Sequence, residues 1–337
     1  MEKPVRFTKL NSLNDILSFP DMKKYLHIFY SDFMLDMFPD DTKDLPLLRV
    51  DEIAETPWDD PFSDVTNQLM AAVDTILDLK VRHLRKAILL WDDNKPWDIS
   101  CEERGGKNRA FLLAPEEPLI DRSKKHPAVV LVPGGGYTDV CFSGEGNPMI
   151  LFLEAHGYTV FTLRYRVGED GHYPAPQDDL ARAITYVREH ADDYSIDPND
   201  LTVIGFSAGG HLCLSEAALH DGIERPDRIV VGYPVVSFVH EPHEGSALYN
   251  AGEDKVLREK LSVENMIGAD FPPTFAWACE DDDCVPVSNT RLLDKALSEK
   301  NIRHETHIYP TGGHGCWLAF ANSAHEWSLK MLEFIKK

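Results

Sequence analysis

Gly205-Phe206-Ser207-Ala208-Gly209 is a G-x-S-x-G stretch whose flanks give it structural meaning. The β-branched run 201–204 before it is typical of a short buried strand, and residues 210–218 after it have the composition of a helix. A serine between glycines at a strand-to-helix turn is the pattern of a nucleophile elbow, in which the hydroxyl stands clear of the sheet. The helix N-terminus also favours the negative charge that develops when a serine attacks a carbonyl. The stretch therefore predicts that Ser207 is a nucleophile.

A nucleophilic serine needs a base, and His314 is the best candidate downstream. It lies among glycines in Gly312-Gly313-His314-Gly315, directly after the predicted strand 305–309. An imidazole on such a loop is free to reach the serine. For any one of the 14 histidines the alternative is a surface or capping role, and position favours catalysis only for His314.

The base in turn needs an orienting acid, and four carboxylates follow the predicted strand 274–279. They run from Glu280 to Asp283, and most of them are expected to belong to a solvated turn. The acid must be buried enough to hold the imidazole in one tautomer. We choose Asp282, and Asp281 remains the alternative.

The stretch Pro133-Gly134-Gly135-Gly136-Tyr137 follows another apolar run, 128–132. Three glycines at the carboxyl end of a strand let backbone N–H groups point into a site without a side chain in the way. The alternatives are a flexible loop or a phosphate-binding loop. The lysine of a nucleotide-triphosphate loop is missing, which favours a loop that stabilises an oxyanion.

Together these motifs resemble the α/β-hydrolase-fold serine esterases of the acetylxylan-esterase-like and carboxylesterase/lipase-like branch. The matching stretches occur in that family's order over roughly residues 87–337: 133–137, 163–166, 173–178, 196–198, 205–211, 272–275, 282–286 and 312–315. The resemblance implies an α/β fold with a mostly parallel central sheet flanked by helices. It also implies that the oxyanion donors are the amides of Gly135, Gly136 and Ala208. Pro133 stands where the hormone-sensitive-lipase branch has a histidine, which is closer to the acetyl-esterase branch.

The chain divides into two regions. Residues 87–337 alternate strands and helices and form the predicted catalytic domain, with an insert at about 236–270 that should border the site. Residues 1–86 form a predicted helical extension, with a Pro- and Asp-rich stretch at 39–61. The apolar residues at helical spacing are Met22, Tyr25, Leu26, Phe29 and Phe33 in one helix, and Leu69, Val73, Ile76, Leu77 and Leu84 in a longer one. This extension either caps the site, braces the sheet or forms a dimer surface, and we favour the cap.

Composition and charge limit the binding partners and the cellular location that we expect for this protein. The net charge is −22, which disfavours nucleic acid and anionic membranes. The first residues do not resemble a signal peptide, and no apolar run approaches the roughly 18 residues of a membrane span, so a cytoplasmic location is expected. The six cysteines are expected to be free thiols. Of these, Cys284 and Cys316 are expected in the core, with oxidation sensing as the alternative.

The sequence thus predicts a serine carboxylesterase for a small-molecule ester, most simply an acetyl or other short acyl ester, with acetylated sugars implied by the resemblance. No cofactor or metal is expected, because serine chemistry needs neither. The stretch His240-Glu241-Pro242-His243-Glu244 might suggest a metal site, but it contains a proline and lacks an evident third ligand, so a solvated loop is expected there. A peptidase or thioesterase with the same triad, or a non-catalytic protein of the same fold, are the alternatives. A homo-oligomer is left open.

Overall fold

The computed structural model describes residues 5–30, 35, 38, 40–53, 65–91, 110–117, 121–320 and 322–336. These residues form an eight-stranded sheet in the order β1-β2-β4-β3-β5-β6-β7-β8. The strands are β1 (Arg85–Leu89), β2 (Phe111–Pro115), β3 (His126–Val132), β4 (Thr159–Arg164), β5 (Ile196–Phe206), β6 (Arg228–Gly232), β7 (Thr274–Cys279) and β8 (His304–Tyr309). From β4 to β8 all neighbouring strands are parallel, whereas β1 and β2 add an antiparallel edge. The expected α/β-hydrolase fold with a mostly parallel sheet is confirmed.

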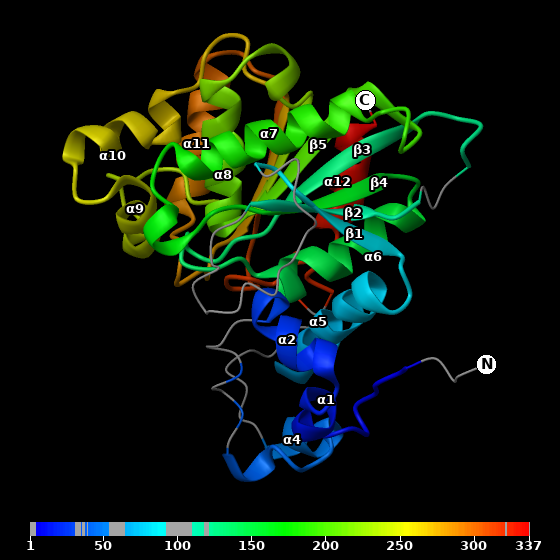
Figure 1. The fold of residues 1–337 in the computed structure, drawn as a ribbon. Coiled ribbons are helices and arrows are strands. Elements are labelled where there is room, and N and C mark those ends of the chain that lie inside the picture. The colour runs from blue at the N-terminus through cyan, green and yellow to red at the C-terminus, as the bar shows by residue number, and fades with distance from the viewer. Residues whose placement is uncertain are drawn as a thin grey trace.

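Helices cover both faces of this sheet (Figure 1). The helices of the catalytic region are α6 (Asn147–Ala155), α7 (Ala175–Glu189), α8 (Ser207–Leu219), α9 (Glu244–Ala251), α10 (Lys255–Leu261), α11 (Ser288–Glu299) and α12 (Trp327–Ile335), with the short helices η2 (Phe142–Gly146), η3 (Gly168–Asp170), η4 (Gly222–Glu224) and η5 (Val263–Asn265). Because both faces are covered, the central strands β3 and β7 carry apolar runs rather than an alternating pattern.

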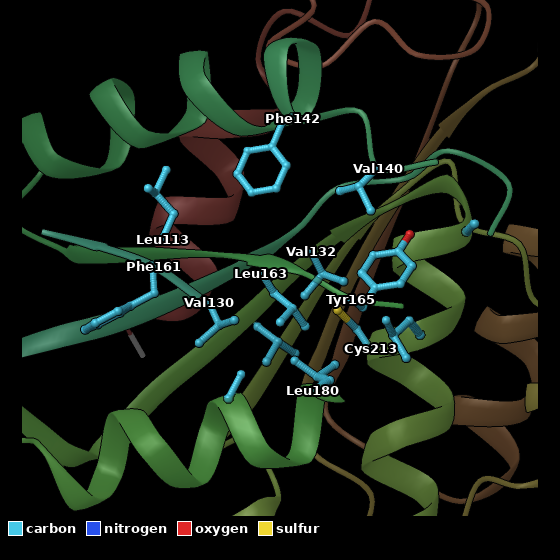
Figure 2. Close-up of a cluster of buried hydrophobic side chains, with 14 of the residues drawn as sticks. Leu113, Val130, Val132, Val140, Phe142, Phe161, Leu163, Tyr165, Leu180 and Cys213 are labelled. Carbon is cyan, nitrogen blue, oxygen red and sulfur yellow. The ribbon is translucent and has the colours of Figure 1, made fainter. Parts of the chain in front are cut away.

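The two core layers follow from the alternation of side chains along each strand. In β3, Val130 and Val132 pack in the cluster that includes Leu180 of α7, as Figure 2 shows, together with Cys213 of α8. Their neighbours Val129 and Leu131 face the other cluster, which contains side chains of α6 and α12: Met149, Ile150, Leu153, Trp327 and Met331. The sheet is therefore buried on both sides and gives the loops at its carboxyl edge a rigid support.

The N-terminal extension contains α1 (Leu13–Leu17), α2 (Pro20–Phe29), η1 (Asp40–Thr42), α4 (Leu47–Ile53) and α5 (Val65–Lys80). In Figure 1, α1 and α4 lie farthest from the sheet, with α2 and α5 between them and the strands. Phe29 of α2 makes edge contacts with Phe111 of β2 and Phe142, at centroid distances of 6.2 and 5.4 Å. The aromatic side chains of α2 therefore pack into the main core rather than against solvent.

One helix boundary in the extension was predicted wrongly. Leu84 was assigned to the longer helix, but α5 ends at Lys80 and Leu84 is 44% exposed, just before β1. Leu84 continues the helical spacing only by sequence coincidence, since the chain must leave the helix to enter the sheet. Phe33 lies outside the described residues, and of the stretch 39–61 only 40–53 is described.

None of the helices in the described part of the chain combines the length and apolar character needed to span a bilayer.

Candidate active site

Ser207 lies at the sharp turn between β5 and α8. Its φ of +52° is a left-handed backbone conformation that residues other than glycine seldom adopt. The turn is tight enough to require the flanking glycines: a Cβ on Gly205 would stand 2.4 Å from the carbonyl oxygen of Gly209, and one on Gly209 would stand 2.0 Å from that of Val132. The local sequence thus imposes the elbow, and the first turn of α8 lies against the end of β3.

Three side chains from separate loops meet at this turn. The Ser207 hydroxyl donates to Nε2 of His314 at 2.9 Å, and Nδ1–H of His314 donates to Oδ2 of Asp282 at 2.8 Å. The Asp282 side chain is fully buried and that of His314 is 13% exposed. The structure therefore brings the three residues predicted as nucleophile, base and acid into one hydrogen-bonded row, with the imidazole held in the tautomer that can accept the serine proton.

The four neighbouring carboxylates occupy different environments. The second oxygen of Asp282, Oδ1, accepts the amides of Cys284 and Val285 at 3.0 and 2.9 Å, which fixes the carboxylate inside its own loop. The Asp281 carboxylate instead accepts the amides of Gly312 and Gly313 at 3.0 and 2.9 Å.

Asp281 thus holds the glycines that precede His314, while Asp282 contacts the imidazole itself. Glu280 and Asp283 are exposed, and Glu280 forms a surface ion pair with Arg291. Only Asp282 among the four is buried.

The glycine loop after β3 lies beside the elbow. Gly135 and Gly136 have φ values of +125° and +64°, and the carbonyl of Gly135 accepts the amides of Thr138 and Asp139 at 3.0 and 3.1 Å. Among the described residues, no protein acceptor is seen for the amides of Gly135, Gly136 or Ala208. These three groups, assigned as oxyanion donors from the resemblance, are therefore available to a ligand.

Two buried rings connect this loop to the rest of the molecule. The Tyr137 hydroxyl donates to Nδ1 of His211 at 2.8 Å, and Nε2–H of His211 donates to the carbonyl of Leu261 at 2.9 Å. Burial lowers the pKa of His211 to about 4, so the ring stays neutral and keeps Nδ1 as an acceptor at physiological pH. His211 therefore ties the glycine loop to the insert through α8.

The insert 236–270 carries α9 and α10, and His243 at the start of α9 lies next to the glycine loop. A Cβ on Gly136 would be 3.5 Å from Cε1 of His243. Nδ1 of His243 accepts the amide of Ser246 at 3.2 Å, which caps α9. His243 is half-buried. The described residues contain no cluster of three side chains suited to a metal ion.

The two cysteines near the acid and the base differ in environment. Cys316 is buried, as expected, but Cys284 is exposed, so its assignment to the core is wrong. Its amide donates to Oδ1 of the buried Asp282, while its side chain is exposed. Partial burial and the nearby carboxylates Asp282 and Asp283 raise the pKa of Cys284 to about 11, which keeps the thiol protonated at neutral pH. Cys101 lies outside the described residues.

Comparisons with known proteins match this chain to esterases and related hydrolases. A family model described as BD-FAE matches residues 119–230, which include the glycine loop and the elbow. The crystal structure of an acetyl ester-xyloside bifunctional hydrolase from Caldicellulosiruptor lactoaceticus is 36% identical, with a TM-score of 0.64. The match covers 74% of this chain and 95% of that one.

Two curated relatives extend the same likeness. An endo-1,4-beta-xylanase B of Butyrivibrio fibrisolvens is 32% identical over 60% of this chain, and an acetylxylan esterase of Xylanibacter ruminicola is 30% identical over 62% of it. The matches span only 34% and 44% of those relatives, so this chain corresponds to one part of each. The chain belongs to the esterase family of the α/β-hydrolase fold, among proteins similar to acetylxylan esterases and carboxylesterases.

Proposed function

We propose that this protein is a serine carboxylesterase that hydrolyses short-chain acyl esters through an acyl-enzyme. The observation that carries the proposal is the row of hydrogen bonds from Asp282 through His314 to Ser207. Further support comes from relatives whose names include an acetylxylan esterase and an acetyl ester-xyloside hydrolase.

In the proposed mechanism the Ser207 oxygen attacks the ester carbonyl carbon while its proton passes to Nε2 of His314. The buried carboxylate of Asp282 stabilises the imidazolium that forms. His314 then returns the proton to the leaving alcohol oxygen as the carbon–oxygen bond breaks. A water molecule then attacks the carbonyl carbon of the acyl-enzyme while one of its protons passes to Nε2 of His314. His314 returns that proton to the Ser207 oxygen as the acyl–serine bond breaks, which releases the acid and free Ser207.

The negative charge of each tetrahedral intermediate requires donors that are already in place. We assign this role to the amides of Gly135, Gly136 and Ala208, which lie on the glycine loop and at the first turn of α8. The dipole of α8 adds to the stabilisation, because its N-terminus begins at Ser207.

The proposed substrates are acetyl groups on sugars or xylo-oligosaccharides. This part of the proposal rests on the names of the relatives, since a fold by itself does not define a substrate. The test is a panel of p-nitrophenyl esters and acetylated xylo-oligosaccharides, compared with aminoacyl and thioester substrates. Release of acetate from the oligosaccharides supports the proposal. Faster turnover of the aminoacyl or thioester compounds would instead assign the triad to a peptidase or a thioesterase, and binding without turnover would indicate a non-catalytic protein.

A further inference from the structure

Glu145 is a buried carboxylate directly behind the candidate site, and the mechanism above does not use it. It belongs to η2, the short helix between the glycine loop and α6, and it is 4% exposed. A carboxyl group in such a position is costly to bury unless hydrogen bonds satisfy it. The groups that donate hydrogen bonds to Glu145 therefore indicate its role.

Both oxygens of Glu145 accept hydrogen bonds from groups next to the site. The amide of Gly134, the first glycine of the loop, donates to Oε2. The Tyr233 hydroxyl donates to Oε1 at 3.0 Å. The Tyr233 oxygen in turn accepts the amide of Trp317 at 3.4 Å, which leaves the phenolic hydrogen for Glu145.

These two partners touch the nucleophile and the base. A Cβ on Gly134 would stand 2.8 Å from Cβ of Ser207 and 3.0 Å from Oε2 of Glu145, so this glycine lies between the elbow and the carboxyl group. The ring of Tyr233 meets the ring of His314 edge-on, with 4.7 Å between the centroids. The Glu145 carboxyl group thus accepts hydrogen bonds from the first glycine of the loop and from the hydroxyl of Tyr233, whose ring packs against the imidazole of His314.

We propose that Glu145 is a positioning residue that fixes the oxyanion loop and, through Tyr233, the plane of His314; this proposal rests on the esterase function proposed above. Three successive glycines have little conformational preference of their own. A side-chain acceptor at Gly134 therefore sets the direction in which the following amides, those of Gly135 and Gly136, point. Alignment of such donors before the reaction is a main source of their catalytic effect.

The segment that carries Glu145 is itself held by the N-terminal extension. Phe142, at the start of η2, packs edge-on against Phe29 of α2. Asn147, directly after η2, donates its side-chain amide to the carbonyl of Ala71 in α5 at 2.6 Å. The extension thus contacts both ends of the segment whose centre binds the glycine loop.

The test compares Glu145→Gln and Glu145→Ala with the wild-type enzyme on p-nitrophenyl acetate. The alanine variant leaves both donors without an acceptor, so we expect kcat to fall about 10- to 100-fold while KM changes less than about threefold. The inhibition constant of an aryl trifluoromethyl ketone, which mimics the tetrahedral intermediate, should rise by the same factor as kcat falls. Glutamine keeps one acceptor and should recover part of the activity.

Glu216→Gln is the matched control. Glu216 is another fully buried glutamate, on α8 roughly 13 Å along the helix from Ser207. Its substitution should leave kcat and the ketone inhibition constant unchanged. If the Glu145 variants acted only through a general loss of stability, Glu216→Gln would lower the melting temperature as they do. The selective fall in kcat at nearly constant KM would then be absent.

Tyr233→Phe keeps the test decisive if the Glu145 variants do not fold, because it removes one of the two donors and leaves the carboxyl group in place. We expect a smaller fall in kcat, again matched by weaker ketone binding. Folded variants of Glu145 or Tyr233 with wild-type kcat and ketone affinity would overturn the positioning role alone. A wild-type protein without esterase activity, or activity that survives in Ser207→Ala, would overturn the proposed function instead.

Discussion

The carboxylate of Asp282 lies 2.8 Å from Nδ1 of His314, while the adjacent Asp281 binds the glycine amides before that histidine. Two consecutive carboxylates thus contact the same loop in different ways. One can set the tautomer of the imidazole, and the other can set the path of the backbone that carries it. This division makes their roles separable by substitution.

Asp282→Asn should lower kcat by about 10⁴-fold, because an amide in this position favours the wrong imidazole tautomer. Asp281→Asn keeps the size of the side chain and one acceptor oxygen, so a loss of at most about tenfold is expected. Asp283→Asn changes an exposed carboxylate and serves as the control. Steady-state rates on a soluble acetate ester measure all three. Equal and mild losses in the three variants would place the acid outside this cluster.

Ser207→Ala should reduce kcat by roughly 10⁶-fold, the loss typical of a serine triad without its nucleophile. The fold should persist, because the substitution removes one oxygen and keeps the Cβ at the elbow. A fluorophosphonate probe should label the wild-type protein at Ser207, as mass spectrometry of the digested protein can show. Retention of most activity, or a label on another residue, would contradict the role assigned to the elbow.

Acetyl and propionyl esters should be turned over faster than esters of long acyl chains. The reason is the similarity to acetylxylan esterases, together with the acidic composition of the chain. Discrimination by a pocket amounts to about 1–3 kcal/mol for each methylene that it cannot accommodate. Values of kcat/KM along a series of p-nitrophenyl esters measure the trend. Preferential hydrolysis of emulsified long-chain triglyceride would identify a lipase.

Phe29→Ala should destabilise the protein by about 3–5 kcal/mol, because it leaves a cavity between Phe111 and Phe142. Leu10→Ala, at a side chain that is 74% exposed, should change the free energy of unfolding by less than about 0.5 kcal/mol. Urea unfolding gives both values. The packing of Phe29 favours a brace over the cap that we preferred from the sequence.

Deletion of residues 1–60 extends this comparison. It removes α1, α2 and α4 and uncovers apolar side chains of α5 and η2, so aggregated or strongly destabilised protein is expected. A soluble truncated enzyme whose selectivity alone had changed across the ester panel would favour the cap instead.

The sequence by itself determined the elements whose signals are local. Glycine spacing around Ser207 specifies a turn because any Cβ at Gly205 or Gly209 would collide with nearby backbone. Apolar runs of strand length located β3, β5 and β7, since buried parallel strands have few polar interruptions. The predicted strand 305–309 falls within β8, whose sequence alternates instead. The resemblance carried by these ordered motifs then gave the fold class.

Only the tertiary structure distinguished the role of Asp282 from that of Asp281. The two residues are neighbours in the sequence, and they differ in the groups that their carboxylates bind on the loop 312–314. The same holds for Glu145 and Tyr233, whose partners lie in other loops. A charged residue between Gly144 and Gly146 was the one available sign of a special position. The tertiary structure likewise decided that α5 ends at Lys80, because the chain must leave the helix before it enters β1. Leu84 therefore lies exposed between the two elements. Hydrogen bonds between distant segments have no periodic pattern in the sequence, so they become visible only once the sheet has brought those segments together.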